Sequence, residues 1–194
     1  WFQGRMEFGP RALGNRSILA DPRSDDTQRT LNLKIKYREG FRPFAPSVLA
    51  EDADKLFSVG APSPYMLLTG RVSESLLKPL PDNYDKMDMY EKLYVPRSEL
   101  PAITHVDFSA RVQSVDGIHN PRYHKLLSAF KKITGVGCLV NTSFNVRGEP
   151  IVCTPDDAYL CFMQTEMDYM VLGNYFFAKE DQPILDEKYH KKFT

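Results

Sequence analysis

The chain has 194 residues, of which 42% are hydrophobic, 25 are basic and 25 are acidic. These values are typical of a single globular domain with a sizeable core, and they exclude a disordered chain. Because the opposite charges cancel, no overall field favours nucleic acid or a membrane surface as a partner. Residues 1–49 nevertheless hold nine basic and five acidic side chains, so an anion site is expected near the start of the chain.

The cysteines are odd in number and have apolar neighbours, at Cys138, Cys153 and Cys161. This pattern predicts reduced core thiols and a cytoplasmic protein. The sequence has no apolar run of the length of a membrane span and no signal-peptide pattern. Since the chain opens on Trp1 rather than on methionine, we interpret it as a fragment of a longer protein.

In the first half of the chain, turn and cap residues delimit short elements. Pro10 suits the first position of a helical turn, and Asp25 can cap a helix that Gly40 stops. Pro46 restricts its strand to an edge or irregular position, because proline donates no ladder hydrogen bond. The predicted elements are a helical turn at 9–14, strands at 16–21, 44–49 and 65–72, and helices at 25–37 and 51–58.

The second half contains the clearest helix signals. Asn120 precedes a helix that ends at Gly135, and Thr154 opens another as part of a capping box. The predicted elements are a loop-rich excursion at 74–101, strands at 103–115, 138–140, 169–172 and 175–178, and helices at 120–135 and 154–167. Interleaved strands and helices indicate an α/β fold with a mixed sheet. We expect one domain over residues 1–182 and a charged tail at 183–194.

The segment at 34–42 is cationic and spans a predicted helix end. If Lys36 and Arg42 turn inward, they present a point charge and a planar fork that suit a phosphate or carbamoyl group. The alternative is a solvated helix terminus whose charges complement the helix dipole. Composition alone favours this alternative, since runs of charge are usually solvated.

A second candidate is the glycine-rich segment around Arg11. Gly9 and Gly14 bracket the arginine, so backbone amides can approach an anion while the guanidinium covers it. The segment lacks the ending of a P-loop. A tight turn with a surface arginine is the alternative.

A third candidate follows the predicted buried strand at 138–140. Open α/β sheets place ligands at the carboxyl ends of their strands. The amides of Asn141 and Asn145 and the hydroxyl of Ser143 could therefore bond phosphate or ribose oxygens. The alternative is a turn in which these side chains bond their own backbone.

The predicted strand at 103–115 places His105, Asp107 and Arg111 on one side. A His-x-Asp pair could bind a metal, but no third ligand is identifiable, so we predict no metal site. We favour Arg111 as an anion ligand that Asp107 orients.

The segments that carry the strongest combined signal are GRMEFGPRALGNRSI at 4–18, FRPFAP at 41–46, THVD at 104–107, ARVQ at 110–113, NTSFN at 141–145 and GEPIV at 148–152. In this order they resemble the C-terminal domain of the nodulation-type and antibiotic-tailoring O-carbamoyltransferases. The resemblance covers nearly the whole chain, apart from residues 60–100 and the tail.

The resemblance implies a YrdC-like fold, which is a twisted mixed parallel and antiparallel sheet flanked by helices. It implies that this domain converts carbamoyl phosphate and ATP, accompanied by Mg²⁺, into carbamoyl-adenylate and pyrophosphate. A separate N-terminal Kae1-like domain, of which this sequence shows nothing, would then pass the carbamoyl group to an acceptor hydroxyl.

The same resemblance assigns Lys36 and Arg42 as catalytic residues, and Arg11, Arg111, Asn141, Ser143 and Asn145 as residues that bind substrate or nucleotide. Two other functions remain open. One is a non-catalytic module that binds a nucleotide or RNA, although the balanced charge argues against RNA. The other is a scaffold for an ATPase-like partner domain.

Overall fold

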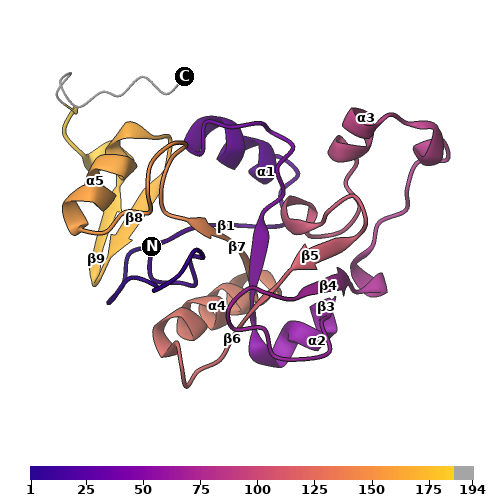
Figure 1. Cartoon of the computed structure of the whole chain (residues 1–194), viewed down its shortest axis with the longest axis horizontal. Coiled ribbons are helices and arrows are strands. Elements are labelled where there is room, and N and C mark those ends of the chain that lie inside the picture. Colours follow the sequence, from indigo (N-terminus) through magenta and orange to yellow (C-terminus); the bar gives the residue numbers. More distant parts are fainter. Residues whose placement is uncertain (186–194) are drawn as a thin grey trace.

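The computed structural model describes residues 1–185, so most of the predicted tail, at 186–194, lies outside the described residues. The strands are β1 (Ser17–Ala20), β2 (Ala45–Leu49), β3 (Phe57–Ser58), β4 (Thr69–Val72), β5 (Ser109–Arg111), β6 (Gln113–Val115), β7 (Cys138–Ser143), β8 (Tyr169–Leu172) and β9 (Tyr175–Ala178). The α-helices are α1 (Thr27–Thr30), α2 (Ala53–Leu56), α3 (Met89–Tyr94), α4 (Pro121–Thr134) and α5 (Pro155–Gln164). Single 3₁₀ turns lie at Ala50–Asp52, Glu74–Leu76, Tyr84–Lys86, Pro101–Ile103 and Lys179–Asp181, and a π-helical turn lies at Leu31–Ile35. The predicted α/β class with a mixed sheet is confirmed (Figure 1).

The central sheet has the strand order β1-β7-β2-β6, in which β7 is antiparallel to both neighbours and β2 is parallel to β6. The edge position predicted for Pro46 is wrong, because β2 is an interior strand. The backbone N–H of Leu49 donates to Gly137, on the β7 side. By alternation the nitrogen of Pro46 faces β6, where pairing begins only at Ser47. The missing donor therefore breaks no ladder hydrogen bond.

The remaining strands form a three-stranded antiparallel sheet, β3-β4-β5, and the β8–β9 hairpin. The single strand predicted at 103–115 is wrong, because this segment is divided between β5 in the small sheet and β6 in the central one. Ile103 ends a 3₁₀ turn, residues 104–105 are irregular, residues 106–108 form a turn and a bend, and Phe108 has a φ of 63°. His105 and Asp107 therefore do not continue the strand that carries Arg111.

The two helices with clear end signals are confirmed. The side chain of Asn120 accepts a hydrogen bond from a backbone N–H at the start of α4, and Gly135 ends this helix with a φ of 82°. Thr154 and Asp157 form the predicted capping box of α5, which ends at Gln164. Among the helices of residues 1–185, none combines the length and the apolar character of a membrane span.

The helix predicted from Asp25 to Tyr37 is shorter and irregular. Asp26 occupies the position before α1, and its side chain makes no capping bond, so the predicted cap by Asp25 is wrong. The helix continues as the π-helical turn at Leu31–Ile35. Tyr37 has a φ of 48°, which turns the chain before it reaches Gly40.

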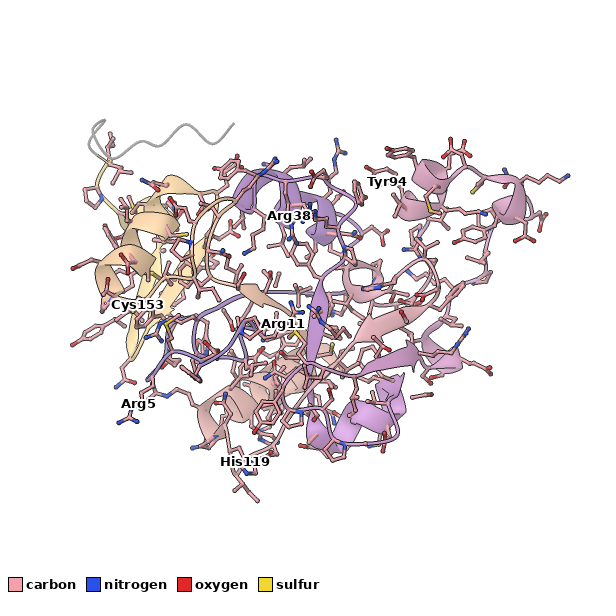
Figure 2. All side chains as sticks on the ribbon, in the orientation of Figure 1. Arg5, Arg11, Arg38, Tyr94, His119 and Cys153 are labelled. Atoms are coloured by element: carbon pink, nitrogen blue, oxygen red, sulfur yellow. The ribbon has the colours of Figure 1, made fainter. Side chains whose placement is uncertain are left out.

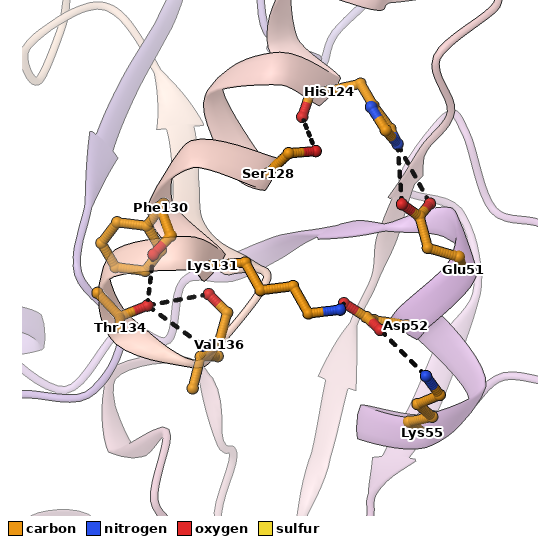
Figure 3. Close-up of polar contacts among 9 residues, drawn as sticks. All are labelled: Glu51, Asp52, Lys55, His124, Ser128, Phe130, Lys131, Thr134 and Val136. Carbon is orange, nitrogen blue, oxygen red and sulfur yellow. Dashed lines mark hydrogen bonds and ion pairs between the residues drawn. The ribbon is translucent and has the colours of Figure 1, made fainter.

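Figure 3 shows how α4 is attached to the turn that precedes α2. Nζ of Lys131 lies 2.6 Å from Oδ2 of Asp52, and Nε2 of His124 lies 3.1 Å from Oε1 of Glu51. The Asp52 side chain is only 6% exposed, so its pairing is poorly screened by water. Gly137 leaves room for it, because an added Cβ would lie 2.7 Å from Oδ2 of Asp52. These contacts hold α4 beside the central sheet.

Candidate functional site

A small cavity lies where β7 ends, β2 begins and β5 ends. Its volume is about 170 Å³, and its polar lining consists of Arg11, Arg38, Arg111, Asn141, Thr142 and Ser143. We name it the arginine cavity. None of its lining residues within the described chain is acidic. Figure 2 shows Arg11 near the centre of the molecule and Arg38 beside α1.

The Arg111 guanidinium is buried in part and forms no ion pair with another described residue. Within residues 1–185 its Nε has no hydrogen-bond partner, and Nη2 approaches only Sδ of Met66, at 3.9 Å. Burial lowers the pKa of Arg111, and the charge of Arg11 lowers it further. An arginine keeps its proton despite such shifts. The cavity therefore holds neighbouring positive charges that repel each other, and an anion would relieve this repulsion.

Arg11 lies in a loop whose shape is set by side chains from other segments. The predicted helical turn at 9–14 is wrong, because these residues form bends without helical hydrogen bonds. Oε1 of Glu7 accepts from the backbone N–H groups of Leu13 and Asn15, at 2.6 and 2.8 Å. Nε2 of Gln113 donates to the carbonyl of Leu13, at 2.9 Å. These tertiary bonds replace the local ones that a helical turn would make.

Asn141 belongs to a buried polar network beneath this loop. Its Nδ2 donates to the carbonyl of Ala12, to Oγ of Ser47 and to Oε1 of Gln113, at 3.1, 2.9 and 2.9 Å. The residue is only 2% exposed, and its Oδ1 has no partner among the described residues. The structure thus brings Asn141 to the predicted cavity, but its amide protons are already used to hold the Arg11 loop.

Lys36 joins the end of β7 to the segment that follows it. The residue is 4% exposed. Its Nζ donates to the carbonyl of Ser143, to the carbonyl of Asn145 at 2.9 Å and to Oδ1 of Asn145 at 2.8 Å. Oγ of Ser143 also donates to Oδ1 of Asn145, at 2.7 Å. Burial, and secondarily the charge of Arg38, lowers the pKa of Lys36 to about 7. Of these predicted site residues, only Ser143 lines the cavity.

Like Lys36 and Asn145, Arg42 does not line the cavity, and it is the one of these three that makes no bond at the end of β7 among the described residues. Its Nε lies 2.9 Å from Oε2 of Glu39, and its side chain is 52% exposed. Burial lowers the pKa of Arg38, and the charge of Arg42 lowers it further, so this charge still reaches the site. Sequence reasoning missed Arg38, which takes the place in the cavity that was expected for Arg42.

The predicted orientation of Arg111 by Asp107 is wrong. Oδ1 of Asp107 instead accepts from the backbone N–H and the hydroxyl of Ser109, at 3.0 and 2.7 Å. Burial lowers the pKa of His105. Over the described part of the chain, no group of three or more His, Cys, Asp or Glu side chains is placed to hold a metal ion. Cys138 and Cys161 are buried as predicted, whereas Cys153 is exposed.

A larger cavity of about 750 Å³ adjoins the arginine cavity, and Pro10 and Arg11 line both. Its walls include the apolar side chains of Phe8, Tyr65 and Leu67 together with polar groups such as Asn15, Gln113 and Asn120. This combination of apolar walls and a few polar groups is typical of small-molecule sites. The two cavities could thus take the apolar and the anionic part of one ligand, with Arg11 between them.

The carbamoyltransferase C-terminus family matches residues 1–179. An uncharacterized protein of Synechocystis sp. is 60% identical over 100% of the chain, nodulation protein NolO of Bradyrhizobium diazoefficiens is 42% identical over 96%, and 3'-hydroxymethylcephem-O-carbamoyltransferase of Amycolatopsis lactamdurans is 41% identical over 93%. The chain spans only 32%, 31% and 30% of the lengths of these relatives. Since the match covers almost every residue, this chain belongs to the carbamoyltransferase C-terminus family.

Proposed function

We propose that this chain forms carbamoyl-adenylate from carbamoyl phosphate and ATP, as the C-terminal part of an O-carbamoyltransferase. The observation that carries the proposal is the arginine cavity, in which Arg11, Arg38 and Arg111 meet without an acidic side chain among the described residues that line it. Its volume of about 170 Å³ is far below that of a drug-sized pocket and suits one small acyl phosphate. The family and the named relatives support the carbamoyl chemistry.

The reaction balances with one water molecule. Water attacks carbamoyl phosphate, and inorganic phosphate leaves to give carbamate. A carbamate oxygen then attacks the α-phosphorus of ATP, the bond to the β-phosphate breaks, and pyrophosphate leaves with that electron pair. In this proposal Mg²⁺ is held by the triphosphate itself. Several anions thus meet in one place, and fixed cations offset their mutual repulsion and the charge that develops in the transition state.

Each side chain has a role in the proposal that follows from its position. Arg111 and Arg11 bind phosphate oxygens, and the Ser143 hydroxyl turns its one proton from Oδ1 of Asn145 to the same group. Lys36 keeps Ser143 and Asn145 in place, and a bound anion favours its protonated, positively charged form at the end of β7. Arg42 leaves Glu39 and turns toward the ligand, which costs little because an exposed ion pair contributes at most about 1 kcal/mol.

ATP places its nucleoside in the larger cavity and its phosphates over Arg11, which both cavities share. The adenylate then serves a Kae1-like domain, which transfers the carbamoyl group to an acceptor hydroxyl. Because the relatives are about three times as long as this chain, the test uses the full-length natural protein.

The experiment is an isotope exchange between labelled pyrophosphate and ATP, in the presence of Mg²⁺ and without an acceptor. Exchange that requires carbamoyl phosphate is the expected result, and Arg111→Met should abolish it. Arg23→Gln is the matched control, because Arg23 is an exposed arginine paired with Asp21 away from the cavity. Absence of exchange in the intact protein, together with salt-sensitive RNA binding, would instead support the non-catalytic alternative.

A further inference from the structure

The guanidinium of Arg38 is hydrogen-bonded at its Nε edge, whereas the edge with its two Nη groups is available to a ligand. Its Nε donates to Oδ1 of Asn32, at 2.7 Å, and the guanidinium carbon lies 5.0 Å from the centre of the Phe44 ring. Its two Nη groups make no hydrogen bond with any other described residue, although the side chain lines the arginine cavity. A guanidinium fixed in this way presents two parallel donors to an anion.

Asn32 fixes this edge and is out of reach of any ligand. The residue is 0% exposed. Besides accepting from Arg38, it donates through Nδ2 to the carbonyl of Gly40 at 3.1 Å and to the carbonyl of Arg42 at 2.9 Å. Both the amide nitrogen and the amide oxygen of Asn32 therefore form hydrogen bonds with the segment at 38–42. One side chain both sets the path of this loop and aims the arginine.

The irregular helix explains how Asn32 comes to lie there. In the π-helical turn at Leu31–Ile35, the N–H of Lys36 bonds the carbonyl of Leu31, so one extra residue is accommodated in the turn. Tyr37 then adopts a positive φ of 48°, and the N–H of Arg38 returns to the carbonyl of Asn32 at 3.0 Å. Such π-helical turns are found often at functional sites.

We propose that Arg38 is a third ligand-binding cation of the arginine cavity and that Asn32 is the positioning residue that aims it. The identity of the anion as carbamoyl phosphate rests on the proposed function, whereas the arrangement of the two side chains does not. Asparagine is required because it offers both an acceptor and donors. Aspartate would keep the bond to Arg38 but would set an oxygen against the carbonyls of Gly40 and Arg42.

The test measures the binding of inorganic phosphate to the full-length protein by calorimetry. Arg38→Gln should raise the Kd about tenfold or more, the loss expected for a hydrogen bond to a charged group. Asn32→Asp should raise it by a smaller factor. The double variant Arg38→Gln/Asn32→Ser should bind no more weakly than Arg38→Gln alone, because Asn32 is out of reach of the ligand and serine adds no charge that would repel the anion. In the exchange assay, KM for carbamoyl phosphate should rise more than kcat falls.

Arg23→Gln serves as the control, and Asn32→Ser replaces Asn32→Asp if the latter does not fold. The proposal is overturned if Arg38→Gln binds phosphate within about twofold of the wild type, a change too small for a lost charged contact. It is also overturned if the effects of the two substitutions multiply in the double variant, as independent structural damage would. Phosphate binding does not depend on the formation of an adenylate. If the wild type shows no exchange between pyrophosphate and ATP, the proposed function is wrong, but the calorimetry still decides whether Arg38 and Asn32 act as inferred here.

Discussion

Replacing Arg111 by methionine should weaken anion binding without weakening the fold. The substitution keeps an unbranched apolar stem and removes a guanidinium whose Nε has no partner among the described residues. Burial and the charge of Arg11 both oppose the positive charge of Arg111. The free energy of unfolding without ligand should therefore stay within about 0.5 kcal/mol of the wild type or rise by up to about 1 kcal/mol.

Adding phosphate to the same unfolding experiment measures how much anion binding Arg111→Met has lost. A hydrogen bond to a charged group contributes about 1.5–3 kcal/mol, so Kd should rise about tenfold to a hundredfold. At a phosphate concentration of about 100 times the wild-type Kd, ligand binding stabilises the wild type by about 2.7 kcal/mol, and it should stabilise Arg111→Met by only about 0.4–1.4 kcal/mol. Urea unfolding with and without phosphate measures both quantities.

Two results would refute this reasoning. Equal stabilisation of the wild type and Arg111→Met by phosphate would mean that Arg111 does not bind the anion. A loss of more than about 2 kcal/mol without phosphate would mean that the guanidinium supports the fold, as removal of a buried and paired charge does. Arg23→Gln, which removes an exposed arginine, should match the wild type in both measurements.

Three further predictions concern the surroundings of the cavity. Burial lowers the pKa of Lys36 from 10.5 to about 7. Between pH 7 and 10.5 the unfolded chain therefore binds one more proton than the folded chain, and the free energy of unfolding should rise with pH by up to about 1.4 kcal/mol per pH unit. Urea unfolding at several pH values should show this rise in the wild type and not in Lys36→Met. Gly137→Ala places a Cβ 2.7 Å from Oδ2 of Asp52 and should cost about 1–3 kcal/mol in thermal unfolding, whereas Gly117→Ala meets only contacts of 3.7 Å or more and should cost less than 1 kcal/mol. Thr154→Ala breaks the capping box of α5 and should lower the free energy of unfolding in urea by about 1 kcal/mol. An unchanged free energy of unfolding would contradict this prediction.

The parts of the fold that could be predicted from the sequence are those with local causes. Asn120 and Gly135 mark the ends of α4 because the first caps a backbone N–H and the second adopts a positive φ. Thr154 marks α5 in the same way. The interior place of β2 could not be predicted, because Pro46 is tolerated only through the register of β6, which begins one residue later. That register depends on contacts distant in sequence.

The candidate site could be predicted only in part, because the direction of some of its side chains also depends on contacts distant in sequence. The segments with Arg11, Arg111 and Ser143 do meet at one cavity. Arg38 was missed because its direction depends on Asn32, a π-helical turn and a positive φ at Tyr37, none of which has a clear sequence signal. Residue spacing on a regular helix gives the wrong face for a side chain that follows such a turn.

The most direct measurement is a crystal structure of the full-length protein soaked with inorganic phosphate and, separately, with carbamoyl phosphate. We predict one phosphate group in the arginine cavity, within hydrogen-bond distance of the guanidinium groups of Arg11, Arg38 and Arg111. An anion bound at a different place, with these three guanidinium groups turned away from it, would contradict the account.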